Sequence, residues 1–260
     1  LQRVALWLAI IDQASTLTEL LHFDTAFPQG SLVLEAGCGV GAQTVTLART
    51  SPHASFVSAD ISQDSLAQAQ ARVHAAGLSN VTFRHADIFA LPFAEAHFDH
   101  AVVCFVLEHL TTPERALAEL RRVLKPGGTL TVIEGDHGSA YFHPESAAAR
   151  HAVQCLVDLQ RTAGGDALIG RRLYPLLVQA GVRDVRVSPR MVYADASRPS
   201  LVDGFIRKTF TAMVEGVGDR ALQAGLADPA SWQAGIRDLY RTAEPDGTFC
   251  YTFFKAVGRR

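Results

Sequence analysis

The chain has 260 residues, of which 48% are apolar, and this content is enough to bury a large core. Its formal net charge of −2 gives no long-range attraction to nucleic acid or to an anionic membrane surface. Lysine is confined to Lys125, Lys208 and Lys255, which also argues against a basic face for nucleic acid. We therefore expect no nucleic-acid partner.

The four cysteines (Cys38, Cys104, Cys155 and Cys250) are far apart and form no C-x-x-C pair. This spacing indicates reduced thiols of a cytoplasmic protein rather than a zinc site or a disulfide framework. The apolar run from Leu1 to Ile11 is too short to span a bilayer, and no small-residue cleavage site follows it. We expect no membrane span, and an amphipathic helix there rather than a targeting segment.

The first half of the chain alternates strand and helix patterns. Apolar residues at helical spacing over 4–23 predict one or two helices, and the continuous run Leu32 to Leu34 predicts a buried parallel strand. Glycines at 37, 39 and 41 then turn the backbone before a helix. The following pattern predicts helices over 42–48, 62–76 and 113–124, strands over 54–60, 81–87, 98–105 and 129–134, and a turn at 125–128.

Beyond Glu134 the pattern predicts helices over 144–161 and 169–179, strands over 182–193 and 248–257, and a mostly helical segment over 197–244. Repeated strand and helix units indicate an α/β fold, with a Rossmann-like, doubly wound, seven-stranded sheet that is mostly parallel and has an antiparallel last strand. We expect residues 30–196 and 245–260 to form this core. Residues 1–29 are expected to supply N-terminal lid helices and 197–244 a helical insertion that completes the lid.

Acidic residues stand at or near the ends of four predicted strands, namely Glu35, Asp60, Asp87 and Glu134. Ligands of parallel sheets bind beyond the carboxyl ends of the strands, near the point where the strand order reverses. The sequence therefore predicts a ligand site at this edge, although Asp87 and Glu134 also suit the simpler role of capping the next helix.

These residues resemble the class I S-adenosylmethionine-dependent methyltransferases. Val33-Leu-Glu-Ala-Gly-Cys-Gly-Val-Gly41 is similar to the family's acid-x-Gly-x-Gly-x-Gly loop, and Asp60 matches the acid that binds the ribose. Asp87-Ile88, the segment from Phe98 to Leu110 and the turn at 124–130 match further family segments. The resemblance covers about 32–134 well and the last two strands more loosely, and it implies S-adenosylmethionine as the cofactor.

The glycine spacing also fits an NAD(P)-dependent oxidoreductase, with Asp60 at the distance that ribose recognition requires. Glu35 separates the two interpretations, because a carboxylate two residues before the first glycine suits a cationic amino group and would repel a pyrophosphate. An S-adenosylmethionine-binding protein without methyl transfer remains a further alternative, since binding and chemistry are separable.

On the resemblance, we assign the cofactor to one set of residues. Glu35, Gln43 and the backbone of Gly37, Gly39 and Gly41 are expected at the methionine portion, and Asp60 at the ribose. The remaining expected contacts are Ile61, Asp87 and Ile88 at the adenine and Phe105 beside the methyl donor.

The sequence indicates less about the methyl acceptor than about the cofactor. A hydroxyl or aromatic carbon benefits from a general base, for which His137, Asp136 and His109 are candidates. Glu134, Arg190, Tyr193 and Tyr240 are candidate acceptor contacts. The histidines match no zinc pattern, so no metal is expected. The layout looks most like quinone and natural-product methyltransferases, which implies a small-molecule acceptor under a lid and a monomer or homodimer.

Overall fold

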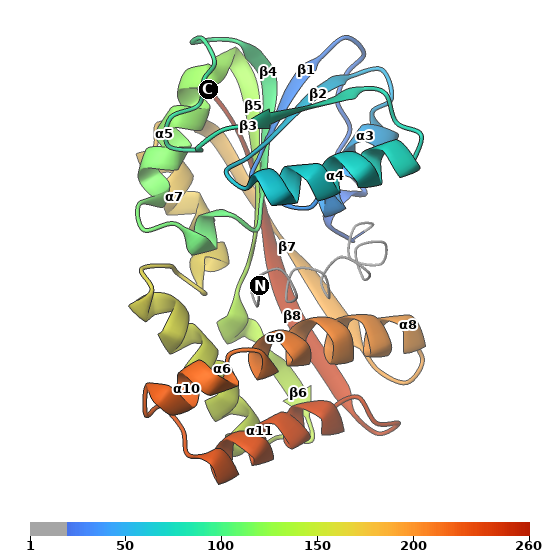
Figure 1. Ribbon diagram of the computed structural model, residues 1–260, viewed down its shortest axis with the longest axis vertical. Coiled ribbons are helices and arrows are strands. Elements are labelled where there is room, and N and C mark those ends of the chain that lie inside the picture. Colours follow the sequence, from blue (N-terminus) through green and yellow to red (C-terminus); the bar gives the residue numbers. More distant parts are fainter. Residues whose placement is uncertain (1–19) are drawn as a thin grey trace. The chain divides into compact units, whose positions relative to one another are not determined.

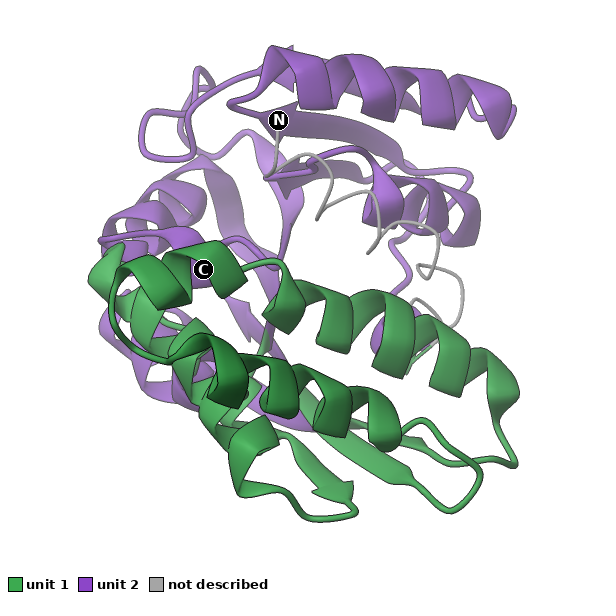
Figure 2. Ribbon diagram, turned by 60° about the horizontal axis from the view of Figure 1, so that its bottom comes forward, with its two compact units in different colours: residues 1–20, 135–168, 190–253 green, residues 21–134, 169–189, 254–260 purple. Residues whose placement is uncertain are grey.

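The computed structural model describes residues 20–260 (Figure 1). The predicted helices within 4–19, and with them most of the expected N-terminal lid, lie outside the described residues. In the described part, every helix is too short or too polar to cross a membrane. The described residues divide into two compact units (Figure 2): residues 20, 135–168 and 190–253 form unit 1, and residues 21–134, 169–189 and 254–260 form unit 2.

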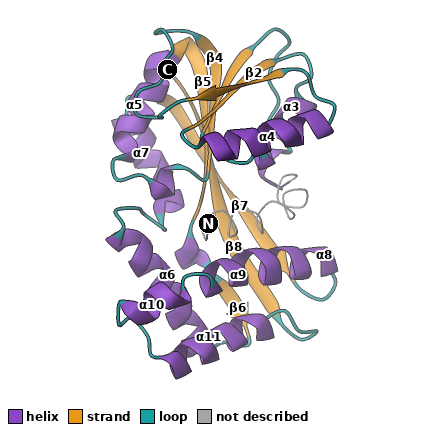
Figure 3. Cartoon of the chain, in the orientation of Figure 1, coloured by secondary structure: helices purple, strands orange, loops and turns teal. Residues whose placement is uncertain are grey.

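The strands form a sheet with the order β3-β2-β1-β4-β5-β8-β6, and β7 also pairs with β8 (Figure 3). In unit 2, β1 pairs in parallel with both β2 and β4, and β2–β3 and β4–β5 are parallel as well. The strand order reverses between β1 and β4, so this is the topological switch point. The bounds are β1 Leu32–Ala36, β2 Ser55–Asp60, β3 Val81–His85, β4 Phe98–Cys104 and β5 Leu124–Gly135.

This arrangement confirms the predicted Rossmann-like, mostly parallel α/β fold. The sheet has eight strands rather than seven, because β6 (Tyr141–His143) is also present and pairs antiparallel with β8 (Thr248–Arg259). Three residues are too few to show a strand periodicity in sequence. The twelve-residue strand β7 (Arg183–Ala194) agrees with the predicted strand over 182–193.

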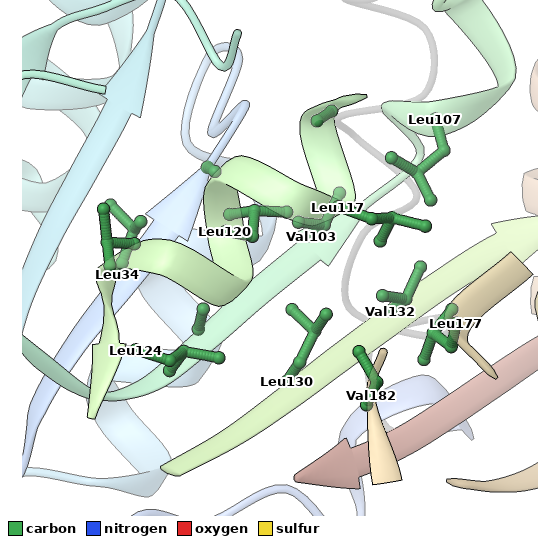
Figure 4. Close-up of a cluster of buried hydrophobic side chains, with 14 of the residues drawn as sticks. Leu34, Val103, Leu107, Leu117, Leu120, Leu124, Leu130, Val132, Leu177 and Val182 are labelled. Atoms are coloured by element: carbon green, nitrogen blue, oxygen red, sulfur yellow. The ribbon is translucent and has the colours of Figure 1, made fainter. Parts of the chain in front are cut away.

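The two faces of the unit 2 sheet bury alternate residues of the same strands. Leu34 and Val103 belong to a large apolar cluster with residues of α5 (Pro113–Val123) and α7 (Leu173–Gln179) (Figure 4). The neighbouring residues Val33 and Val102 pack instead with residues of α3 (Ala42–Thr50). Helices therefore cover both faces, as successive side chains of a strand point to opposite sides. α4 (Gln63–Ala75) begins after Ser62, whose hydroxyl accepts a hydrogen bond from the Ser65 N–H.

The predicted turn at 125–128 is wrong: these residues are part of β5 and form a bulge within it. Phe98 pairs with Leu124 but His100 pairs with Thr129, so the register shifts there. The N–H of Arg260 donates to the Gly128 carbonyl at 2.9 Å. The C-terminal end of the chain thus supplies hydrogen bonding that stabilises an extended path where local sequence favours a turn.

Unit 1 combines β6, the ends of β7 and β8, and several helices. The segment predicted to be helical over 197–244 is indeed mostly helical, and it includes η4, a ten-residue π-helix (Val202–Thr211). π-Helical turns are rare and frequently occur at functional sites. The other helices of unit 1 are α6 Ala147–Thr162, α8 Pro199–Leu201, α9 Ala212–Glu215, α10 Gly218–Gln223 and α11 Pro229–Arg241.

Leu120 of α5 tests the unit 2 core. Its side chain is fully buried in the cluster of Figure 4. We expect Leu120→Ala to lower the free energy of unfolding by about 2–5 kcal/mol, because it removes apolar contacts and leaves a cavity. Glu114→Ala, at an exposed position of the same helix, should cost less than about 1 kcal/mol. Urea unfolding of both variants measures the difference, and equal losses would contradict the assigned core.

Candidate cofactor and acceptor sites

The glycine loop between β1 and α3 is held by hydrogen bonds within unit 2. The Gly37 N–H donates to the Ala59 carbonyl at 2.8 Å, the Gly39 N–H to Asp60 Oδ2 at 2.8 Å, and the Gly41 N–H to the Cys38 carbonyl at 3.0 Å. All three glycine N–H groups are therefore engaged by the protein itself. This leaves them unavailable to a pyrophosphate, which binds such loops through backbone N–H groups.

Gly39 is the open position of the loop. Its φ of +52° lies in the left-handed region, and a Cβ added there would meet no atom within 4 Å. A side chain at this position would fill that space. The loop thus keeps an open position directly beside the Asp60 carboxylate, as a bound cofactor would require.

Glu35 lies beneath the loop and is only 3% exposed. Its Oε2 accepts hydrogen bonds from Thr44 Oγ1 of α3 and Ser58 Oγ of β2, each at 2.7 Å. Burial raises the pKa of Glu35 above its ordinary value, although both hydroxyl donors act in the opposite direction. Glu35 therefore ties together the end of β1, the first turn of α3 and β2.

Asp60, at the end of β2, positions the backbone on both sides of itself. Its Oδ2 accepts from the Gly39 N–H, and its Oδ1 accepts from the Ser62 N–H at 2.9 Å. A carboxylate has about four lone-pair sites, so these two bonds leave Asp60 with capacity for ribose hydroxyls.

The predicted adenine contacts differ in exposure. Ile61 is 66% exposed, and its carbonyl lies 2.8 Å from the His85 ring nitrogen Nε2. Asp87 is exposed and its Oδ1 accepts from the Phe89 N–H, so it caps the turn after β3, while Ile88 packs against the large apolar cluster. An exposed isoleucine next to Asp60 offers an apolar surface on which a flat base can stack.

Gln43, in the first turn of α3, has a partner that sequence reasoning did not suggest. Its Oε1 lies 2.8 Å from Nε2 of the buried His22, whose Nδ1 is 3.3 Å from Thr25 Oγ1. The buried Lys255 donates to Thr25 Oγ1 at 2.6 Å and to Asp24 Oδ1 at 2.5 Å. These contacts tie residues 22–25 to α3 and to β8.

Phe105 follows β4 with a φ of +58°, and its N–H donates to the Ile133 carbonyl at 2.9 Å. Glu134, fully buried at the end of β5, accepts from the next two N–H groups, those of Val106 and Leu107. His109 is largely exposed, with Nε2 3.7 Å from Glu108 Oε1. Phe105 and Glu134 are thus close in unit 2, and His109 stands one short helical turn beyond them.

Asp136 and His137 belong to unit 1 and are both buried. Asp136 Oδ1 accepts from the Gly138 N–H at 3.0 Å, which caps the short helix at His137–Ser139. His137 Nδ1 lies 2.8 Å from the Tyr251 hydroxyl, and its ring packs edge-on to Phe210 of the π-helix. The sequence did not single out Tyr251, although alternation along β8 puts it on the same face as Phe249 and Phe253.

The predicted acceptor contacts within unit 1 lie on two elements, β7 and α11. Arg190 and Tyr193 both lie on β7, but they are three residues apart, so one is buried and the other 43% exposed on the opposite face. Tyr240 of α11 donates to Glu215 Oε2 at 2.8 Å, and burial together with Glu215 raises the pKa of Tyr240 to about 12. Glu134 belongs to unit 2.

Within residues 20–260, no group of three or more His, Cys, Asp or Glu side chains is arranged to hold a metal ion. His151, for example, has its Nε2 2.9 Å from the Leu226 carbonyl. The free cysteines of the described chain are Cys38, Cys104, Cys155 and Cys250.

Comparison with known proteins assigns the first part of the chain to a family. Residues 34–132 match the model of a methyltransferase domain. An uncharacterized 37.1 kDa protein in transposon TN4556 of Streptomyces fradiae is 33% identical over 223 residues, covering 80% of this chain and 63% of that protein. The demethylmenaquinone methyltransferase of Thermus thermophilus is 39% identical over 102 residues, covering 39% of this chain and 46% of that enzyme.

Among solved structures, the cyclase SpnF superposes with a TM-score of 0.57 and 24% identity, covering 94% of this chain and 80% of that chain. At this identity the likeness concerns the fold. The chain spans less than two thirds of the length of both relatives named above.

Glu35 gives a prediction on the pH dependence of stability. Because the folded protein raises the pKa of Glu35, the folded state holds that proton more tightly, and this contribution to the free energy of unfolding decreases as pH rises above about 4.5. Glu35→Gln cannot ionise. Its stability relative to wild type should therefore improve between about pH 5 and about pH 8, as measured by urea unfolding.

Glu119→Gln is the matched control. Hydrogen bonds from Arg122 lower the pKa of Glu119, so the stability that it contributes is present above about pH 4.5 and is lost as pH falls. The stability of the Glu119 variant relative to wild type should therefore stay constant between about pH 5 and about pH 8, where that of the Glu35 variant improves, and it should change only below about pH 4.5. Parallel trends in the two variants would contradict the assigned environment of Glu35.

Proposed function

We propose that this chain, whose residues 34–132 match a methyltransferase domain, is a class I S-adenosylmethionine-dependent methyltransferase that transfers a methyl group from that cofactor to a small-molecule acceptor. The observation that carries the proposal is the glycine loop of unit 2. Its glycine N–H groups are bonded internally, Gly39 leaves open space, and Asp60 keeps lone pairs for a ribose. This combination supports a cationic methionine portion on a ribose over the pyrophosphate of a nicotinamide cofactor.

The proposed cofactor contacts extend along the loops of unit 2. Asp60 would accept hydrogen bonds from the ribose hydroxyls, and Ile61 would offer its exposed surface to the adenine, with Asp87 and Ile88 beside it. Phe105 would flank the methyl donor. Glu35 and Gln43, both already bonded within the protein, would act on the methionine portion together with the backbone of Gly37, Gly39 and Gly41.

When bound, the cofactor supplies a methyl group on a cationic sulfur, and the leaving group is a neutral thioether. The protein therefore has no leaving-group charge to stabilise, and its tasks are to orient the acceptor and to exclude water. An oxygen or carbon acceptor also loses a proton, which a general base removes. We propose His137 for this role, with Asp136 and His109 as the other candidates.

The acceptor proposed here is a small, partly apolar molecule of the quinone or natural-product type. The Thermus relative, whose name states that it methylates demethylmenaquinone, supports the quinone class. The aromatic side chains around His137 in unit 1 also suit a flat apolar molecule. In this proposal the helices of 197–244 form the lid, Arg190, Tyr193 and Tyr240 are the candidate acceptor contacts, and the protein works in the cytoplasm as a monomer or homodimer.

Asp60→Ala tests the cofactor assignment. Loss of a charged hydrogen-bond acceptor should weaken the binding of S-adenosylhomocysteine about 10- to 100-fold in isothermal titration. Asp64→Ala, an exposed carboxylate in the first turn of α4, is the control and should bind as wild type does. Unchanged affinity in the Asp60 variant would refute the ribose contact.

His137→Gln tests the proposed base. With a radiolabelled methyl donor and a panel of hydroxylated quinones, we expect kcat to fall about 100-fold or more while the affinity for S-adenosylhomocysteine is retained. His53→Gln, at an exposed histidine, serves as the control, and His109→Gln compares the second candidate. If the wild type binds the cofactor but labels none of these acceptors, the alternative of a cofactor-binding protein without methyl transfer gains support.

A further inference from the structure

Glu134 combines complete burial with incomplete hydrogen bonding. Its Oε1 accepts from the Val106 N–H at 3.0 Å and from the Leu107 N–H at 2.7 Å, whereas its Oε2 has no hydrogen-bond partner among residues 20–260. A buried polar atom without a partner is unfavourable, and native proteins hold few of them. Such exceptions are expected where function rather than stability selects the residue.

The backbone that Glu134 holds is strained. Phe105 has a φ of +58°, a left-handed conformation that bulky side chains rarely adopt. The Phe105 N–H donates to the Ile133 carbonyl. Ile133 and Glu134 of β5 together therefore accept hydrogen bonds from three successive N–H groups, those of residues 105–107. Without these acceptors the turn would relax toward an ordinary conformation.

This turn packs directly on the glycine loop. A Cβ at Gly37 would overlap the side chain of Val106, so the two residues are in close contact. Gly37 in turn donates to the carbonyl of Ala59, the residue before Asp60. A continuous set of contacts within unit 2 therefore links Glu134, through Val106, to the loop that we assign to the cofactor.

Burial and the neighbouring Glu108 carboxyl raise the pKa of Glu134 well above its ordinary value. A carboxyl group offers an oxygen that accepts hydrogen bonds whether it is ionised or protonated. A glutamine side chain can accept the same bonds without any charge. The hydrogen-bonding capacity of Glu134, and not a negative charge, is what the turn requires.

We propose that Glu134 is a positioning residue for the cofactor: by binding the Val106 and Leu107 N–H groups, it keeps Phe105 left-handed and Val106 against Gly37. The inference rests on the proposed function. It replaces the direct acceptor contact expected of Glu134 with an indirect role toward the cofactor.

The experiment measures the dissociation constant of S-adenosylhomocysteine by isothermal titration. Glu134→Leu keeps the size of the side chain and removes the acceptor, so affinity should fall about tenfold or more. Glu134→Gln retains an acceptor and should stay within about threefold of wild type. Leu176→Ala, a truncation in the buried cluster on α7, should lower the melting temperature without changing the affinity.

A double-mutant cycle with Phe105→Gly examines the strained turn itself. Glycine adopts a φ of +58° without strain, so Glu134→Leu should weaken binding less in the Phe105→Gly background than in wild type. An equal loss in both backgrounds would overturn the positioning role.

Two further outcomes separate the possible failures. If wild type does not bind S-adenosylhomocysteine, the proposed function fails; if wild type binds and Glu134→Leu binds equally well, only the inference fails. If Glu134→Gln binds S-adenosylhomocysteine as weakly as Glu134→Leu does, the positioning role is also overturned. Should Glu134→Leu not fold, Val106→Ala trims the contact to Gly37 without burying a lone polar group, and an unchanged affinity in that variant contradicts the proposal.

Discussion

Carboxyl groups at the ends of parallel strands hold the loops of unit 2 in place. Glu35 at the end of β1 binds hydroxyls on α3 and β2, Asp60 at the end of β2 binds two loop N–H groups, and Glu134 at the end of β5 binds two more. Asp60 and Glu134 satisfy backbone N–H groups of the loops beyond the strands, whereas Glu35 satisfies side-chain hydroxyls. The geometry of the loops at this edge of the sheet depends on these acceptors.

Burial of Glu35 and Glu134 carries a cost, because both pKa values are raised and neither site contains a basic partner among the groups that shift it. Glu119 shows the contrasting case, in which an arginine lowers the pKa of the carboxyl and the pair stabilises the fold. Acids that weaken stability at neutral pH are retained at the glycine loop and at the Phe105 turn. This distribution fits a region in which loop geometry matters more than stability.

The sequence predicted those elements of the fold that depend on the local pattern of residues. The repeated strand and helix patterns predicted the parallel sheet because both element types follow from periodicity, whereas the ligand site at the acidic strand ends stays a prediction. The bulge at 125–128 escaped prediction because its partner, Arg260, lies 132 residues beyond Gly128 in the sequence. The Tyr251 partner of His137 is 114 residues away, so local pattern could not reveal it, whereas the opposite orientation of Arg190 and Tyr193 already follows from alternation along the strand predicted over 182–193.

The similarity to known proteins also covers only part of the chain. The family match ends at residue 132, whereas Asp136, His137 and the helices of unit 1 lie beyond it. The matched part contains the glycine loop, Glu35 and Asp60, whereas Glu134 lies just beyond it, so likeness there constrains the cofactor far more than the acceptor. A cyclase shares the fold, which illustrates that one scaffold can host different reactions. Under the proposed function, the candidate acceptor residues around His137 lie where the family pattern does not reach, so substitutions of the aromatic side chains there are expected to alter acceptor choice.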